Sequence, residues 1–162
     1  MNKVYLLIGG NMGDRMANLK DAIKHIEQQV GNVQLLSSIY ETEAWGQTNQ
    51  PNFYNQALLL HTQLASTELM NKLLEIENFM GRVRTVKMGP RTIDIDIIYF
   101  NNEVITSELI TIPHPKLTER KFVLTPLVEI APNYIHPFLN KSNTHLLKDC
   151  GDSLAVYKKT DN

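Results

Sequence analysis

A stretch in the middle of the chain alternates apolar and polar residues with the period of a β-strand. The sequence from Gly89 to Ile98 places isoleucine at positions 93, 95 and 97, with polar residues between them. Side chains two positions apart on a strand point to the same face. The pattern therefore predicts a strand with one apolar face and with Asp94 and Asp96 together on the other, about 6.5 Å apart along the strand.

This acidic pair follows directly on a basic run. The ten residues from Arg82 to Arg91 contain four cations and no acid, at Arg82, Arg84, Lys87 and Arg91. Two neighbouring carboxylates can share a divalent cation or hold two of them, and guanidinium groups bind phosphate oxygens. The combination favours a polyphosphate site with Mg²⁺, although an Asp-x-Asp on a strand is by itself more often a solvated face.

The composition limits the other classes of function. A chain of 162 residues with 43% hydrophobic content predicts one domain, residues 1–162, with a sizeable core. A net charge of −1 argues against binding of nucleic acid through its backbone. Cys150 is the only cysteine, which excludes an intrachain disulfide and a thiolate zinc cluster. Because the sequence shows neither an apolar membrane span nor a signal-peptide pattern, we expect a soluble cytoplasmic protein.

Hydrophobic periodicity divides the first hundred residues into strands and helices. Strands are predicted from Val4 to Ile8, from Val33 to Thr42, from Phe53 to Thr62, and from the aspartate pair to Phe100, with helices at 16–30 and 66–80. Ser66 is the predicted N-cap of the second helix, and Gly31 and Gly81 end the two helices. The glycine-rich segment 9–14 matches no nucleotide-binding motif, so a tight turn and a loop close to a ligand both remain open.

The last third of the chain predicts shorter elements. Extended segments are expected at 104–105 and 109–112, and Pro113 and Pro115 hold His114 in rigid extended backbone. A helix is expected at 118–130 with an interruption near Pro126, then a terminal helix at 142–150 and a short segment at 155–158. The loop at 43–51 carries the only tryptophan, Trp45, either as a lid over a ligand or as an anchor to the core.

The order of these elements predicts the fold. Strand, helix, strand, strand, helix, strand is the split βαβ order of a ferredoxin-like α+β sandwich. The extra C-terminal strands and helices would cover or flank the sheet. This scaffold carries RNA binders, regulators and enzymes, so the fold alone does not decide the function.

Several motifs together resemble one family. The segment from Lys87 to Ile98 looks like the signature of the 6-hydroxymethyl-7,8-dihydropterin pyrophosphokinases of folate biosynthesis. The resemblance extends over nearly the whole chain, through the segments 9–11, 51–57, 81–84, 112–114 and 122–127. Their order along the chain makes the resemblance far more specific than any single motif.

The resemblance implies a reaction and a set of site residues. Pyrophosphate would pass from ATP, the co-substrate, to the hydroxymethyl group of the pterin, releasing AMP. Asp94 and Asp96 would hold two Mg²⁺ ions, and Arg82 and Arg91 would be catalytic. The pterin would be bound by Thr42, Ala44, Trp45, Phe53, Asn55 and Phe122. ATP would be bound by Glu77, Arg82, Arg84, Arg91, Ile97, Ile98, His114 and Arg120. The expected partners are these two small molecules, with no nucleic acid, no membrane and no obligate protein partner.

Three other readings compete with this one. Another Mg²⁺-dependent nucleotidyl or phosphoryl transferase would need the same aspartates and arginines, and only its acceptor would differ. RNA binding on a ferredoxin-like sheet is disfavoured, because the central strand carries two acids and the net charge is near zero. A non-catalytic ligand-binding module would leave Asp94 and Asp96 beside an arginine-rich loop without a purpose.

Overall fold

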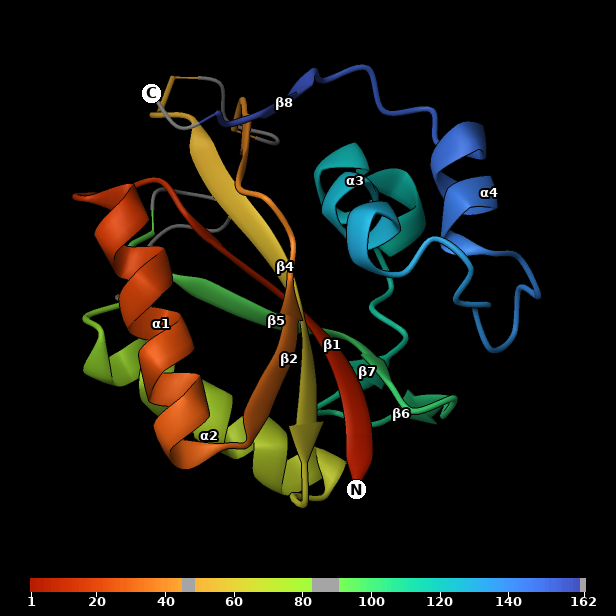
Figure 1. Ribbon diagram of the computed structural model, residues 1–162, viewed down its shortest axis with the longest axis horizontal. Coiled ribbons are helices and arrows are strands. Elements are labelled where there is room, and N and C mark those ends of the chain that lie inside the picture. The colour runs from red at the N-terminus through yellow and green to blue at the C-terminus, as the bar shows by residue number, and fades with distance from the viewer. Residues whose placement is uncertain (45–48, 83–90, 161–162) are drawn as a thin grey trace.

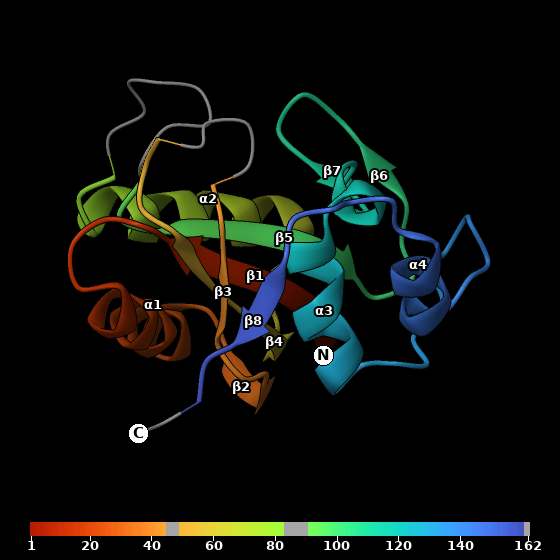
Figure 2. The same ribbon diagram turned by 90° about the horizontal axis from the view of Figure 1, so that it is seen from above.

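A mostly antiparallel sheet forms the centre of the protein, with helices on both faces (Figures 1 and 2). The computed structural model describes residues 1–44, 49–82 and 91–160. The five-strand path through the sheet runs β5(Asp94–Phe100), β1(Asn2–Gly10), β4(Phe53–Thr62), β3(Tyr40–Thr42) and β8(Val156–Lys158), and β2(Asn32–Leu36) also pairs with β4. The first four predicted strands thus pair in the order of a ferredoxin-like sheet, which confirms the α+β prediction.

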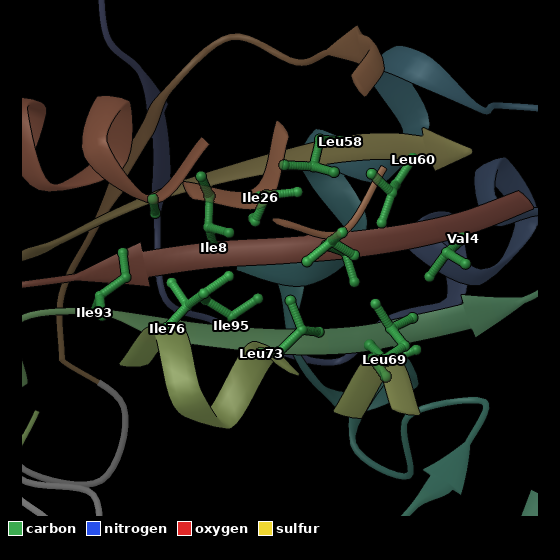
Figure 3. Packing of buried hydrophobic residues seen from close by; sticks show 14 of the residues in the cluster. Val4, Ile8, Ile26, Leu58, Leu60, Leu69, Leu73, Ile76, Ile93 and Ile95 are labelled. Atoms are coloured by element: carbon green, nitrogen blue, oxygen red, sulfur yellow. The ribbon is translucent and has the colours of Figure 1, made fainter. Parts of the chain in front are cut away.

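Two helices cover one face of this sheet. α1(Arg15–Gln29) follows β1, and α2(Ser66–Phe79) follows β4. Their buried residues, including Ile26, Leu69 and Leu73, pack against Val4 and Ile8 of β1 and the isoleucines of β5 (Figure 3). Alternation along β5 therefore works as predicted, because Ile95 and Ile97 enter this core.

The C-terminal extension covers the opposite face. A 3₁₀ turn, η1(Leu117–Glu119), leads into α3(Lys121–Ile130), and α4(Asn143–Asp149) follows. Val123, Leu124 and Leu127 of α3 pack on Leu7, Ala57 and Ile98 of the sheet. A separate hairpin, β6(Ile105–Thr106) and β7(Thr111–Ile112), lies outside the main sheet. None of the helices within the described ranges is long and apolar enough to span a bilayer.

Four boundaries differ from the sequence prediction. β1 continues through Gly9 and Gly10, where we expected the strand to end in a turn or a loop, because these residues pair with Asn55 and Tyr54 of β4. The predicted strand at 33–42 is interrupted at 37–39. The N-cap of α2 is Ala65 instead of Ser66, with Glu68 Oε1 accepting the Ala65 N–H at 3.3 Å.

The fourth difference concerns the helix predicted at 118–130. It divides at Arg120, between η1 and α3, and α3 then continues through Pro126. Proline at the sixth position removes one backbone hydrogen bond. We attribute the intact helix to the burial of Val123, Leu124 and Leu127 on the sheet, since helices in proteins are stabilised mainly by such packing.

Candidate active site

A pocket lies at the end of the sheet where β5 begins, on the face that α3 covers. It is lined by Leu7, Gly9, Thr42, Glu43, Phe53, Asn55, Arg91, Asp94, Asp96, Arg120 and Phe122. These residues come from five separate parts of the chain: β1, β3 with the residue that follows it, β4, the start of β5, and the start of α3. The pocket thus brings both predicted metal ligands together with four of the predicted pterin-binding residues.

The two aspartates occupy neighbouring positions on the pocket side of β5. Asp94 pairs with Gly9 of β1 and Asp96 pairs with Leu7, so both carboxylates project from an edge strand toward the pocket. Desolvation raises the pKa of Asp96 well above its usual range, and the charges of Asp94 and Glu77 raise it further. Crowded carboxylates of this kind gain from a bound cation.

Asp94 is held by two arginines from the basic segment. Arg82 Nη1 lies 2.5 Å from Asp94 Oδ1, and Arg91 Nη1 lies 3.3 Å from Asp94 Oδ2. The side chains of both arginines are largely buried, at 11% and 20% exposed. The positive and negative parts predicted from the sequence therefore meet directly at Asp94.

Glu77 supports this arrangement from the other side of the sheet. Its side chain on α2 is only 2% exposed, and its Oε2 accepts the Ile95 N–H at 2.7 Å and Arg82 Nη1 at 3.2 Å. Glu77 does not line the pocket. The family resemblance assigned Glu77 to ATP binding, and the structure places its carboxylate against β5.

The hard oxygen ligands of Asp94 and Asp96 fit Mg²⁺. Among the residues with described positions, no group of three or more histidine, cysteine, aspartate or glutamate side chains could hold a metal ion. A Mg²⁺ ion held by one or two carboxylates keeps positions for nucleotide oxygens and water. That requirement suits a site in which the cation arrives with phosphate.

The apolar side of the pocket is built from two aromatic residues on different elements. Phe53 begins β4 and Phe122 lies in the first turn of α3, and both line the pocket. The guanidinium carbon of Arg91 lies 5.2 Å from the centre of the Phe53 ring. The arginine of the pocket is thus in contact with its aromatic side.

A polar edge lies beside these rings. Asn55 is 4% exposed, and its Nδ2 is buried without a hydrogen-bond partner in the described structure. A buried amide donor of this kind is costly unless a ligand pairs with it. Thr42, at 2% exposed, stands opposite Phe53 in the ladder between β3 and β4. These features fit a flat heterocycle that stacks on aromatic rings and offers acceptors at its edge.

The glycines at the end of β1 are required by close packing. A Cβ atom on Gly9 would lie 2.0 Å from Asn55 Oδ1, and one on Gly10 would lie 2.3 Å from the carbonyl oxygen of Thr92. Gly9 itself lines the pocket. The structure thus places Gly9 in β1 beside the pocket instead of in a tight turn.

The predicted ATP-binding residues divide into two groups. Arg120 lines the pocket, whereas His114, Ile97 and Ile98 are not among its lining residues. The backbone N–H of His114 donates to the carbonyl of Ile98 at 3.0 Å, and burial, with the positive charge of Arg120, lowers the pKa of His114 to about 4. Ile97 and Ile98 are buried, and their strand, β5, is an edge of the sheet. Trp45 and Arg84, like the basic-loop residues Lys87 and Met88, lie outside the described residues, whereas Ala44 is buried next to the pocket residue Glu43.

Asn11 is a residue that the sequence did not single out. It is 2% exposed, its Oδ1 accepts the Arg91 N–H at 2.9 Å, and its Nδ2 donates to Gln50 Oε1 and to the Pro51 carbonyl. Asn11 thereby joins the segment before Phe53 to the residue that precedes the β5 region. The signal available was its place in segment 9–11, which carries part of the family resemblance.

Comparison with known proteins shows the family to which the chain is similar. Residues 5–132 match the family model described as 7,8-dihydro-6-hydroxymethylpterin-pyrophosphokinase. A 2-amino-4-hydroxy-6-hydroxymethyldihydropteridine pyrophosphokinase of Aquifex aeolicus is 43% identical over 87% of this chain and 88% of its own length. An enzyme of the same name from Bacillus subtilis is 44% identical, over 80% and 78% of the two chains.

Longer proteins contain a similar segment. A folic acid synthesis protein of Dictyostelium discoideum is 45% identical over 86% of this chain, which corresponds to 21% of its own length. Among solved structures, the wild-type HPPK-DHPS of Plasmodium falciparum with pterin and p-hydroxybenzoate superposes with a TM-score of 0.73. That likeness covers 91% of this chain and 41% of the other at 18% identity, and it concerns the fold.

Proposed function

The chain belongs to the 7,8-dihydro-6-hydroxymethylpterin pyrophosphokinase family of folate synthesis, and we propose how its pocket carries out the reaction. The proposal is that the terminal pyrophosphate of ATP is transferred to the hydroxymethyl oxygen of 6-hydroxymethyl-7,8-dihydropterin. The hydroxymethyl oxygen forms a bond to the β-phosphorus, and the bond from that phosphorus to the oxygen bridging to the α-phosphate breaks. AMP leaves, and the hydroxyl proton is released.

One observation carries the proposal: a single pocket contains Phe53, Phe122 and the unpaired amide of Asn55 next to Asp94, Asp96 and Arg91. A site for a flat heterocycle thus adjoins a site for phosphate. The paired rings favour a flat acceptor, which separates this reaction from a general Mg²⁺-dependent nucleotidyl transfer.

In this proposal the pterin is held between Phe53 and Phe122, and Asn55 donates its free amide hydrogen to an acceptor on the ring edge. Thr42, Ala44 and Trp45 would supply further contacts at that edge. Two rings that fix the plane of the pterin also fix the direction of its hydroxymethyl group, an entropic contribution of several kcal/mol at most. The residues of the aromatic side therefore bind and orient the acceptor.

The charged residues would act on the nucleotide. Arg82 and Arg91 are the proposed catalytic residues. Both guanidinium groups hold Asp94 and would stabilise the charge that develops on the transferring phosphates. Arg84, Arg120 and His114 would bind the rest of the triphosphate, and backbone near Ile97 and Ile98 would bind adenine. Glu77 would act through Arg82 and β5.

Asp94 and Asp96 are the proposed ligands of two Mg²⁺ ions. When bound, Mg²⁺ would neutralise charge on the triphosphate and lower the cost of bringing it next to two carboxylates. The described part of the chain shows no side chain that stands out as a dedicated base. We further propose that residues 1–162 act as one domain, with ATP and the pterin as its partners; the cytoplasmic location stays a prediction.

A product assay tests the reaction. The protein is incubated with ATP, Mg²⁺ and 6-hydroxymethyl-7,8-dihydropterin, and the nucleotide products are separated by chromatography. We expect AMP in a 1:1 ratio to the pterin diphosphate. Formation of ADP in place of AMP would show ordinary kinase chemistry and would refute the proposal.

A further inference from the structure

A glutamate at the far end of α3 binds the segment that leads into the pocket. The carboxylate of Glu129 accepts the Ser38 N–H at 3.0 Å and 3.1 Å, the Ser38 hydroxyl at 2.9 Å and the Tyr40 hydroxyl at 2.6 Å. Partial burial raises the pKa of Glu129, but the hydrogen bonds from Tyr40 and Ser38 outweigh it and hold that pKa below its ordinary value. Glu129 is therefore a charged acceptor for two residues of one short segment.

That segment is the interruption between β2 and β3. Ser37 donates its N–H to the Ala57 carbonyl at 2.9 Å, and its Oγ accepts the Ala57 N–H at 2.9 Å, so the hydroxyl replaces a backbone group of the ladder. The next residue, Ser38, donates its N–H to Glu129 instead of to a strand. Glu129 thus satisfies a backbone donor that the interruption leaves outside the sheet.

The hydrogen bond between Tyr40 and Glu129 restrains β3, the strand that reaches the pocket. Tyr40 is the first residue of β3 and pairs with Asn55, and Thr42 pairs with Phe53. Residues two apart on a strand share a face, so Tyr40 and Thr42 both face α3 and the pocket side. Fixing the Tyr40 hydroxyl therefore fixes the strand on which Thr42 stands.

On α3, too, the residue that makes the contact and the residue that lines the pocket lie on one face. Phe122 and Glu129 are seven residues apart, which is two turns of α3 and about 10 Å along its axis, so they lie on one face. Phe122 lines the pocket with Thr42, and Glu129 binds Tyr40. A charge-assisted hydrogen bond thus joins α3 to β3 at Glu129 and Tyr40, and both elements also contribute a residue to the pocket lining.

We propose that Glu129 is a positioning residue for the pterin: through Ser38 and Tyr40 it sets the distance between β3 and α3, and hence between Thr42 and Phe122. The inference rests on the proposed function, because it assigns the space between these two residues to the pterin. It predicts that loss of this contact weakens pterin binding more than ATP binding. Of the residues assigned to ATP, Arg120 adjoins α3, whereas Asp94, Arg82 and Arg91 belong to other elements.

The test compares Glu129→Gln, Tyr40→Phe and the double variant with wild type. Glu75→Gln is the matched control, because Glu75 is a surface glutamate of α2 with an exposed ion pair to Lys72. The affinities for the pterin and for ATP are measured separately by calorimetry, and folding is followed by circular dichroism. Tyr40→Phe removes only one hydroxyl, so it keeps the test decisive should Glu129→Gln fail to fold.

We expect Glu129→Gln to raise the Kd for the pterin about tenfold, as for loss of hydrogen bonds to a charged group, with the Kd for ATP changed less than about twofold. Tyr40→Phe should give a smaller change in the same direction, and the double variant should be less than additive, because both remove one shared contact. Glu75→Gln should leave both affinities near wild type.

Two results would overturn the inference. The first is an unchanged pterin Kd in folded Glu129→Gln, or in Tyr40→Phe if the first variant does not fold. The second is a parallel loss of pterin affinity, ATP affinity and melting temperature, which would show a general structural role. Wild-type protein that makes no pterin diphosphate would instead refute the proposed function itself.

Discussion

Arg82 Nη1 lies 2.5 Å from Oδ1 of Asp94, so a carboxylate that we assign to the metal is held by a guanidinium that we assign to the phosphates. Arg91 holds the other oxygen of Asp94 at 3.3 Å. In the protein alone these arginines balance the charge of the carboxylate. We expect that phosphate oxygens and Mg²⁺ share these partners when the nucleotide binds.

The aspartate pair gives the first prediction. Asp94→Asn and Asp96→Asn should each lower kcat at least about 100-fold, since loss of a cation site removes several kcal/mol of transition-state stabilisation. Steady-state release of AMP measures this, with Asp21→Asn on the exposed side of α1 as the control. Unfolding of both variants, with no folded but inactive protein, would point to a structural role for the pair.

The shape of the Arg82 side chain gives the second prediction. One guanidinium nitrogen of Arg82 contacts Glu77, the Ile93 carbonyl and Asp94. Arg82→Lys keeps the charge but loses the planar group, so kcat should fall about tenfold or more. Arg15→Lys is the control, because Arg15 pairs with Glu41 and does not line the pocket. Equal kcat in Arg82→Lys and wild type would remove Arg82 from the catalytic residues.

Close packing at Gly9 gives the third prediction. A methyl group in Gly9→Ala would lie 2.0 Å from Asn55 Oδ1, so the amide must move. The Kd for the pterin should rise about tenfold, as expected when a polar group of a site is displaced, with less effect on ATP. Gly151→Ala is the control, since its added methyl would meet no atom within 4 Å. Unchanged pterin binding in Gly9→Ala would separate Asn55 from pterin recognition.

The fourth prediction concerns the dependence of stability on pH. Burial, with the positive charge of Arg120, lowers the pKa of His114 to about 4 in the folded protein, against 6.5 ordinarily. The unfolded chain thus takes up a proton near pH 6.5 that the folded protein takes up only near pH 4. The stability from neutral His114 is present above pH 6.5 and is lost as pH falls toward 4, by roughly 1–3 kcal/mol.

Urea unfolding at pH 7 and pH 4.5 measures this loss. His114→Asn should lose less free energy of unfolding between the two pH values than wild type does. The pKa of His136 is also lowered by burial. That residue is present in both proteins, so its contribution cancels in the comparison. The same pH dependence in both proteins would show that His114 titrates normally.

Local patterns were sufficient to predict most of the fold and part of the site. The alternation around Asp94 and Asp96 fixes which side chains enter the core, so the carboxylates had to face the other way. The strand from Phe53 to Thr62 was predicted with its observed bounds.

Features that depend on contacts between distant segments could not be predicted. Gly9 and Gly10 look like a turn until β4 is placed against them. The interruption at 37–39 requires Ser37 to replace a backbone group in the ladder with Ala57. The side chains of Asn11 and Glu129 make their hydrogen bonds with residues at least 39 positions away. Tyr40, for example, lies 89 positions from Glu129. No short sequence window contains both partners of such contacts.

The central claim is that one pocket holds the pterin beside a nucleotide bound through Asp94 and Asp96. Calorimetric titration of the pterin tests it most directly, with and without Mg²⁺ and an ATP analogue whose α–β bridge is a methylene group. The account predicts tighter pterin binding in the presence of the analogue and Mg²⁺ in wild type, and no such gain in Asp96→Asn. Equal pterin affinity under both conditions in wild type would contradict it.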